Sequence, residues 1–217
     1  GTSHSTGYGI TIASVATHGV EVYGGSVSGA TGIGVLAGDA SVVLLDNVEV
    51  AGMVADANGL GRGVQFQEGA SGRLEDVTIQ DAVDTGILLV DSWHTEVLGC
   101  AVLSTQGSAL GSGSTGAFSE TGDAIVATRS SSSTGPVSDF VAVVENTVID
   151  TPQRAGIVAE DTTVVVVGNA ISGAGHEESG TSIFIQGSAI EGSGSTDTVT
   201  VPADALPFST LVQPLVE

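Results

Sequence analysis

Short apolar runs recur along the whole chain, and this repetition limits the possible fold more than any other feature. One kind of run starts with a small residue and then alternates apolar residues, as in TGIGVLA at 31–37 and TGILLVD at 85–91. A second kind follows in the same unit, as in DNVEVAG at 46–52, and a third apolar patch such as VVLL at 42–45 lies between the two. The shortest spacing between units is 23 residues, from Ile10 to Ile33 and from Val64 to Ile87. Each unit is therefore expected to be three short strands separated by turns.

Strands this short cannot bury an inner face unless the units stack, with each strand pairing in parallel with its counterpart in the next unit. The composition agrees with a narrow aliphatic interior, because 41% of the 217 residues are apolar but only 4% are aromatic. The 32 glycines favour many tight turns. We therefore expect an all-β column of about seven coils, with three short strands per coil.

The units resemble those of the right-handed parallel β-helix repeat family, a pectate-lyase-like superfamily whose wider group includes sugar-processing proteins. The resemblance covers roughly residues 8–201 and implies a single right-handed parallel β-helix over residues 1–201. The segment at 202–217 contains three prolines that break the coil pattern, and it is expected to cap the last coil or to pair with a neighbouring molecule. This family hosts lyases, hydrolases, epimerases, adhesins and inert spacers, so the resemblance leaves the function open.

Members of this family often stack asparagines at one turn, and a similar column precedes the third strand of each unit. It is expected to contain Gly25, Asn47, Asp76, Cys100, Asn146 and Asn169. Asparagine and aspartate tolerate the left-handed backbone conformation, and their side chains can hydrogen-bond along the stack. Cys100, the only cysteine, is therefore expected to be a small, half-buried turn residue and not a nucleophile.

The turn between the first and second strands carries residues that the repeat does not explain. Alignment of the units places Trp93 and His94 there, beside the Ser-rich insertion at 129–139, with a set of charged residues: Asp39, Glu68, Asp91, Arg129, Glu160 and Asp161. We predict a ligand surface at this turn, formed by Asp91, Trp93, His94, Arg129, Glu160 and Asp161. A tryptophan ring can stack on a sugar while carboxylates accept its hydroxyl hydrogens. The alternative interpretation is that Trp93 only covers the gap beneath the insertion.

Charge narrows the range of partners. The chain has 25 acidic residues, four arginines and no lysine, and its formal net charge is −21. Such a surface repels nucleic acid, and no apolar run is long enough to insert into a membrane. The lyases of the resembling fold use a basic residue to remove a proton, and here only Arg129 or Arg62 could serve.

No organic cofactor is expected, and calcium is the metal for which the acids offer oxygen ligands. The segments considered are VADANG at 54–59 and ETGD at 120–123, with HEES at 176–179 as a loose metal cluster. None has the spacing of a known calcium loop or zinc site.

We expect a secreted or cell-surface module that acts as a structural spacer, an adhesion unit or a weak carbohydrate-binding unit, although the chain carries no signal peptide. Its expected partners are a polysaccharide or cell-surface glycan and further copies of the chain. One alternative is a polysaccharide lyase or glycoside hydrolase that works at the flank formed by Asp91, Trp93 and Glu160. The other is a subunit that stacks head-to-tail into a fibre, because uncovered strand stacks are templates for other chains.

Overall fold

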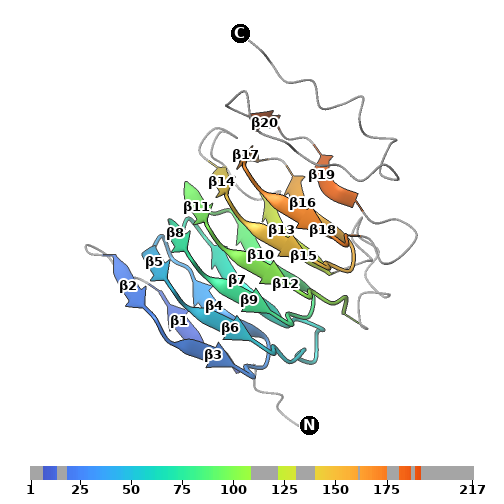
Figure 1. The fold of residues 1–217 in the computed structure, drawn as a ribbon. Coiled ribbons are helices and arrows are strands. Elements are labelled where there is room, and N and C mark those ends of the chain that lie inside the picture. The colour runs from blue at the N-terminus through green and yellow to red at the C-terminus, as the bar shows by residue number, and fades with distance from the viewer. Residues whose placement is uncertain are drawn as a thin grey trace.

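The computed structural model describes residues 7–13, 19–108, 122–130, 140–160 and 162–174, together with strands at 181–186 and 189–191. These residues form a column of three parallel sheets, and Figure 1 shows the strands stacked from the blue N-terminal coil to the red C-terminal one. The described part of the chain contains strands and no helix, which confirms the all-β prediction. Most of the Ser-rich insertion at 129–139 and all of 202–217 lie outside the described residues, as do residues 109–121.

Each sheet collects the equivalent strands of successive coils. The first sheet contains β1 (Ile10–Ile12), β4 (Ile33–Ala37), β7 (Arg62–Gln67), β10 (Thr85–Val90), β13 (Asp123–Thr128), β16 (Ala155–Glu160) and β19 (Thr181–Gln186). The second sheet contains β2 (Val20–Tyr23), β5 (Val42–Asp46), β8 (Ser71–Glu75), β11 (Thr95–Leu98), β14 (Val141–Glu145), β17 (Thr163–Val167) and β20 (Ala189–Glu191). The third sheet contains β3 (Ser26–Ser28), β6 (Glu49–Ala51), β9 (Thr78–Gln80), β12 (Ala101–Leu103), β15 (Val148–Asp150) and β18 (Ala170–Ser172).

The predicted unit of three strands is confirmed, with a slightly smaller number of complete coils than the seven expected. Within the described ranges, six coils have all three strands and a seventh has two. In the five coils from β4 to β18, the first and second strands each pair with a strand of the preceding coil and a strand of the following coil. The predicted equivalence of Val64 and Ile87 is correct. That of Ile10 and Ile33 is wrong by two residues, because Ile10 lies opposite Val35.

The inward side chains form one aliphatic core with a ladder from each sheet. These ladders are Val35, Val64, Ile87, Ile125 and Ile157 in the first sheet, Leu45, Leu74, Val97, Val144 and Val166 in the second, and Val50, Ile79, Val102 and Ile149 in the third. Phe66 is the one aromatic residue in this core cluster of the described residues. The aromatic poverty of the sequence thus matches an interior in which each position is filled mainly by a branched aliphatic side chain.

Two corners of the coils are turned by a single residue with left-handed backbone conformation. After the second strand this residue is Gly24, Asn47, Asp76, Gly99, Asn146 or Gly168, with φ between 50° and 65°. After the third strand it is Gly29, Gly52, Asp81, Ser104, Thr151 or Gly173, with φ between 50° and 66°. Glycine adopts this conformation without strain and Asn or Asp tolerate it, which explains why these residue types recur at the corners.

The predicted turn ladder is correct for Asn47, Asp76 and Asn146 and wrong for its other members. Leu98 pairs with Glu145, so Gly99 is level with Asn146, and Cys100 lies one position later. The same shift of one residue applies to Gly25 and Asn169. The sequence alignment had matched polar residues with one another, whereas the inward aliphatic residues of the third strands determine the register.

Cys100 and Asn169 belong to a second, inner ladder together with Thr147. Each of these side chains reaches a backbone carbonyl of the preceding coil: Cys100 Sγ to Leu74 at 3.5 Å, Thr147 Oγ1 to Val97 at 3.5 Å, and Asn169 Nδ2 to Val144 at 2.7 Å. The side chains of Cys100 and Thr147 are fully buried. This inner ladder links successive coils at the corner where the chain leaves the second sheet.

Candidate functional site

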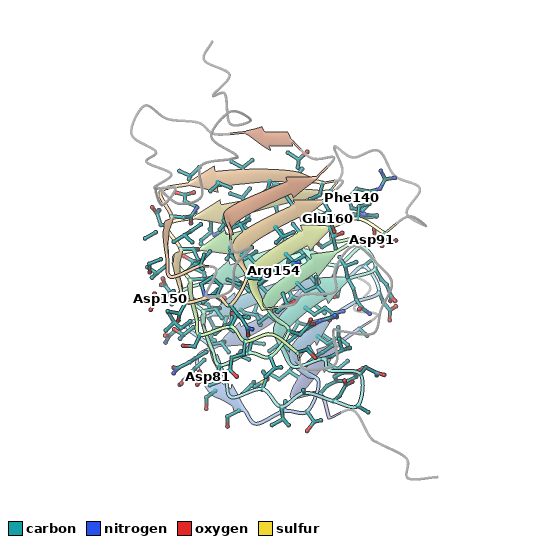
Figure 2. All side chains as sticks on the ribbon, turned by 90° about the vertical axis from the view of Figure 1, so that its right-hand side faces the viewer. Asp81, Asp91, Phe140, Asp150, Arg154 and Glu160 are labelled. Carbon is teal, nitrogen blue, oxygen red and sulfur yellow. The ribbon has the colours of Figure 1, made fainter. Side chains whose placement is uncertain are left out.

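The predicted ligand surface lies on the first turn, the segment between the first and second strands of each coil. The register aligns Gln67, Val90, Thr128 and Glu160 in one row. Glu68, Asp91 and Arg129 therefore follow one another in the next row, and Figure 2 shows Asp91, Glu160 and Phe140 at the same edge of the column. The structure thus places Asp91, Arg129 and Glu160 at the same turn, whereas Asp161 lies outside the described residues.

The first turn has a regular form that changes at Trp93. In the coils of β4 and β7, two consecutive residues have positive φ, Asp39 with Ala40 and Glu68 with Gly69. Each of these turns is closed by a hydrogen bond across it, from Ser41 N to Gly38 O at 3.1 Å and from Ala70 N to Gln67 O at 3.0 Å. This is the pattern of a type I′ turn.

In the coil of β10 the first turn is more open. Asp91 has a φ of 49°, but Ser92 is not among the residues with positive φ. The Trp93 N–H donates to Ala70 O of the preceding coil at 2.9 Å, and Thr95 Oγ1 donates to Trp93 O at 3.0 Å. The segment DSWH is therefore the place where the repeating turn is replaced, and its backbone remains fixed by bonds to the column.

The Trp93 ring lies along the surface of the column. Its side chain is half exposed, at 53%. Two of its ring atoms would be 3.6 and 3.7 Å from a Cβ placed on Gly69, so the indole packs against the turn of the preceding coil. The described contact of Trp93 is thus with Gly69. The alternative interpretation, in which Trp93 covers the gap beneath the insertion, involves residues 131–139, which lie outside the described part.

His94 lies at one end of a row of polar side chains on the outer face of the second sheet. His94 Nε2 lies 3.5 Å from Glu96 Oε1, and Arg73 Nη2 lies 2.7 Å from Glu96 Oε2. Glu75 is a further neighbour of Arg73 at 3.5 Å. The hydrogen bond that the Arg73 guanidinium donates to the Glu96 carboxylate raises the pKa of Arg73. The His94 side chain is 66% exposed, so this row of side chains forms an accessible polar surface that runs from Trp93 along β11 and β8.

Asp91 and Arg129 have structural contacts that limit their freedom to bind a ligand. Asp91 Oδ1 accepts a hydrogen bond from Ser130 N at 2.8 Å, and this contact holds the start of the next turn. The Arg129 guanidinium stacks 5.2 Å from the ring centre of Phe140, which is a cation–π geometry. Glu160 accepts from Thr128 Oγ1 at 3.5 Å. Of the predicted site residues that are described, Trp93 and His94 offer the most accessible side chains.

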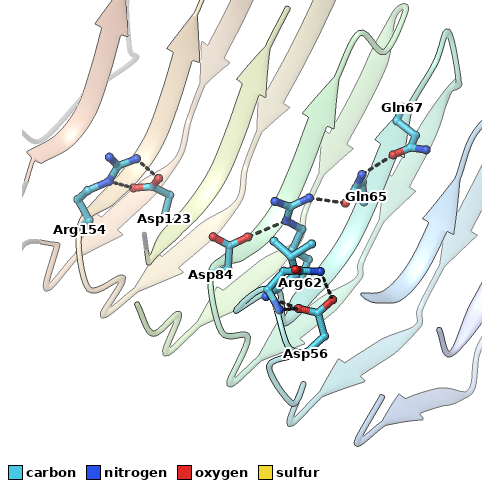
Figure 3. A network of polar contacts seen from close by, with 9 residues as sticks. Asp56, Arg62, Gln65, Gln67, Asp84, Asp123 and Arg154 are labelled. Atoms are coloured by element: carbon cyan, nitrogen blue, oxygen red, sulfur yellow. Dashed lines mark hydrogen bonds and ion pairs between the residues drawn. The ribbon is translucent and has the colours of Figure 1, made fainter. Parts of the chain in front are cut away.

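Two buried ion pairs, which the sequence analysis missed, lie at the start of the first-sheet strands (Figure 3). Arg62 Nε lies 2.7 Å from Asp84 Oδ2, and Arg62 Nη1 donates to Gln65 Oε1 at 2.8 Å. Arg154 Nε donates to Asp123 Oδ1 at 2.6 Å, and Arg154 Nη2 pairs with Asp123 Oδ2. The Asp84 and Asp123 side chains are only 8% and 4% exposed.

The four charges follow the order arginine, aspartate, aspartate, arginine in four successive coils. The two aspartates therefore belong to adjacent coils, with an arginine on the outer side of each. Burial raises the pKa of the Asp123 carboxyl, the nearby Asp84 raises it further, and Arg154 opposes both effects. Both carboxylates are engaged with arginine, so we assign these pairs to the stability of the column.

The Cys100 thiol is expected to be unreactive in the folded protein. Its side chain is 1% exposed, and burial raises the pKa of the thiol from 9.0 to about 11. A thiol reagent at pH 8 should therefore modify the native protein far more slowly than the protein in urea, because only the thiolate reacts. Equal modification rates for the native and the urea-unfolded protein would contradict this assignment. The Cys100→Ser variant, which has no thiol, gives the background signal.

The raised thiol pKa also predicts how stability depends on alkaline pH. The unfolded chain loses the thiol proton near pH 9 and the folded chain near pH 11, so the contribution to stability is complete below pH 9 and disappears as the pH rises toward 11. The loss should approach about 2–3 kcal/mol. It should be absent from Cys100→Ser when urea unfolding is compared at pH 8 and pH 11.

The candidate cation-binding segments have other roles where they are described. The Asp56 carboxylate of VADANG accepts hydrogen bonds from Asn58 N at 2.8 Å and Leu60 N at 3.0 Å, so it organises its own loop. Asp123 of ETGD pairs with Arg154, and HEES at 176–179 lies outside the described residues. Among the side chains that are described, no three His, Cys, Asp or Glu residues gather in a metal-ligating group. The described part also has no helix with the length and apolar character needed to cross a membrane.

Comparison with known proteins identifies the repeat. A family model described as "Right handed beta helix region" matches residues 1–196. No curated protein matches the chain, and no solved structure does. The matched range includes all twenty described strands, from β1 to β20.

Proposed function

Because this chain belongs to the right-handed β-helix family, and because that fold serves many unrelated functions, we propose a function from its exposed residues: a non-catalytic module that binds neutral glycans weakly at the first turn. The column acts as a rigid spacer, and the turn at Trp93 provides the contact. Its expected setting is outside the cell, on a surface or in secreted form.

The observation that carries this proposal is the half-exposed Trp93 ring, held on a turn that departs from the repeat. Backbone hydrogen bonds and the contact with Gly69 limit the loss of freedom when a sugar stacks on the ring. His94 and Glu96 lie next to it and supply groups that can bond to sugar hydroxyls. The net charge of −21 disfavours uronic acid polymers and so favours a neutral glycan.

Trp93 is the only tryptophan, so its fluorescence reports directly on this turn. Titration with neutral oligosaccharides should change the emission, and Trp93→Ala should weaken binding measured by calorimetry by roughly tenfold. The effect is modest because a single exposed ring supplies it. The titrations should be repeated with calcium, because calcium-dependent binding would indicate a bound cation.

Tyr23→Ala is the matched control, since Tyr23 is also an exposed aromatic residue, at 63%, but lies on the first coil. This variant should bind as the original protein does. Equal binding by Trp93→Ala, or no binding to any glycan of the panel, would refute the sugar site and leave a spacer. The appearance of shorter saccharides during the titration would instead support the enzyme alternative.

A further inference from the structure

Three hydrogen-bonded side chains run along the outer face of β7 toward the first turn (Figure 3). Arg62 Nη1 donates to Gln65 Oε1 at 2.8 Å, and Gln65 Nε2 donates to Gln67 Oε1. Gln65 is only 5% exposed, whereas Gln67 stands at the end of the strand with a partly exposed side chain. We call Arg62, Gln65 and Gln67 the polar series, and it connects a buried ion pair with the surface near Trp93.

The guanidinium group fixes the direction of both bonds in the polar series. Arginine has N–H donors and no acceptor, so Gln65 must present its oxygen to Arg62. The Gln65 amide nitrogen then faces Gln67, and it can only donate to the Gln67 oxygen. Gln67 Nε2 is left to donate at the first turn, and among the described residues no acceptor bonds to it.

Neither the sheet nor an ion pair of this kind requires the two glutamines. Gln65 lies in a row between Leu36 and Leu88, so leucine satisfies the packing in both neighbouring coils. Further along the row, the coil that contains the Arg154 ion pair has Val158 at this position. A buried amide has no packing advantage over leucine, so the polar series indicates a role at its exposed end.

The exposed end of the polar series lies beside a carboxylate. A Cβ built on Gly38, in the preceding coil, would be 3.7 Å from Gln67 Nε2 and 3.8 Å from Glu68 Oε2. A donor and an acceptor are thus close to one point at which Gly38 has no side chain. A sugar hydroxyl uses both kinds of partner, because its oxygen accepts one hydrogen bond while its hydrogen is donated in another.

Trp93 borders the same two turns. Its ring lies against Gly69, and the Cβ position of Gly69 is also 3.7 Å from Ala40 Cβ, in the turn that follows Gly38. Gly69 comes two residues after Gln67, so the Cα atoms of these two residues are at most about 7.6 Å apart. A disaccharide is therefore long enough to contact the Trp93 ring and the Gln67 amide together.

We propose that Gln67 determines the specificity of the sugar site. Its N–H donates to a hydroxyl oxygen of the ligand that stacks on Trp93, and the Glu68 carboxylate accepts the hydrogen of the same hydroxyl. Gln65 is a positioning residue, because it holds the Gln67 amide with its N–H toward the ligand. This role rests on the proposed function, since it requires a sugar at Trp93, and it adds the polar contact that selects among neutral sugars.

Calorimetric titration with maltotetraose, cellotetraose and mannotetraose tests the contact, and the saccharide that binds most tightly is used for all variants. Gln67→Glu keeps an acceptor for Gln65 but removes the N–H donor, so it should weaken binding by about tenfold. Gln80→Glu is the matched control, because it makes the same change of charge at an exposed residue of β9, and it should bind as the original protein does. Unchanged affinity of Gln67→Glu would overturn the role of Gln67.

Gln65→Leu tests the positioning role, and it introduces the residue that both neighbouring coils carry in this row. Release of the Gln67 amide should weaken binding severalfold. In a Gln67→Glu background the same substitution should have no further effect, because the donor that Gln65 orients is already absent. Additive losses would show that Gln65 acts only through the stability of the turn, and they would overturn its positioning role.

Nuclear magnetic resonance provides a measurement on the original protein. The side-chain amide signal of Gln67 should shift when the saccharide is added, while that of Gln80 should stay in place. Binding that is lost in Trp93→Ala but leaves the Gln67 signal and the affinity of Gln67→Glu unchanged would overturn this proposal alone. If none of the three saccharides binds the original protein, the proposed function fails and the Gln67 contact fails with it.

Discussion

Replacing Gly72 with alanine is expected to lower the free energy of unfolding by about 3 kcal/mol or more, or to prevent folding. Gly72 lies in β8 between Val43 and Thr95, with a φ of 147°. A Cβ on this residue would overlap the Val43 carbonyl oxygen and lie 2.8 Å from the Val43 carbonyl carbon. The obstacle is backbone in the middle of a sheet, so a side-chain movement cannot relieve it.

Gly52→Asn is the control for this substitution. Gly52 also has a positive φ, 63°, but no atom lies within 4 Å of a Cβ built there. The equivalent position carries Asp81 and Ser104 in later coils, so asparagine should change stability by less than about 1 kcal/mol. Urea unfolding followed by circular dichroism measures both variants, and similar losses in the two would refute the steric explanation.

Replacing Arg154 with methionine is expected to cost about 3 kcal/mol at neutral pH, because the Asp123 carboxylate would remain buried without its counter-ion. Ala155 N, at 3.1 Å, would remain as a hydrogen-bond donor to Asp123, and Asp84 would add a like charge nearby. The combination of Arg154→Met with Asp123→Asn should recover most of the loss, since neither substituted side chain is charged.

An exposed ion pair provides the comparison for the buried one. Arg73 and Glu96 are 46% and 26% exposed, so solvent screens their attraction and Arg73→Met should cost much less stability than Arg154→Met. Urea unfolding measures the free energy of unfolding of Arg154→Met, of its combination with Asp123→Asn, and of Arg73→Met. If Arg73→Met costs as much as Arg154→Met, burial does not distinguish the two pairs.

The sign of the pH dependence gives a further check on the same variants. Because the folded-state pKa of Asp123 is raised, its contribution to stability is present below its ordinary value of 3.8 and decreases as the pH rises through the folded pKa. Removal of Arg154 takes away a group that lowers this pKa, so the deficit of Arg154→Met should shrink in acid as Asp123 binds a proton. Asp123→Asn should abolish that trend.

Much of the architecture could be predicted from the sequence because the fold repeats one local pattern. The alternating strands, their parallel stacking and the aliphatic interior follow from periodicity and composition. The register at the corners could not be predicted in the same way. Matching the coils by residue type placed Cys100 in the corner row, whereas Gly99 occupies it. Counting three residues back from the inward residue of each third strand, such as Val102 or Ile149, gives the correct corner residue.

The ion pairs were missed because they are visible only when coils are compared with one another. In four consecutive coils a charged residue lies at the start of the first strand or directly before it: Arg62, Asp84, Asp123 and Arg154. This series of two aspartates flanked by two arginines was present in the sequence, but the insertion before Asp123 hid the equivalence of the four positions. The structure of the turn at Trp93 could not be predicted either, since the change of turn type depends on backbone angles and not on composition.

The stacked register described for β4, β7 and β10 has a consequence for how such a chain can change over generations. Val35, Val64 and Ile87 occupy one row, so loss of the 23 residues Arg62–Asp84 would place β10 directly on β4. That deletion also removes Arg62 and Asp84 together, so no lone buried charge is left behind. A recombination event can therefore add or delete a whole coil and yield a shorter or longer module with its neighbouring surfaces already matched.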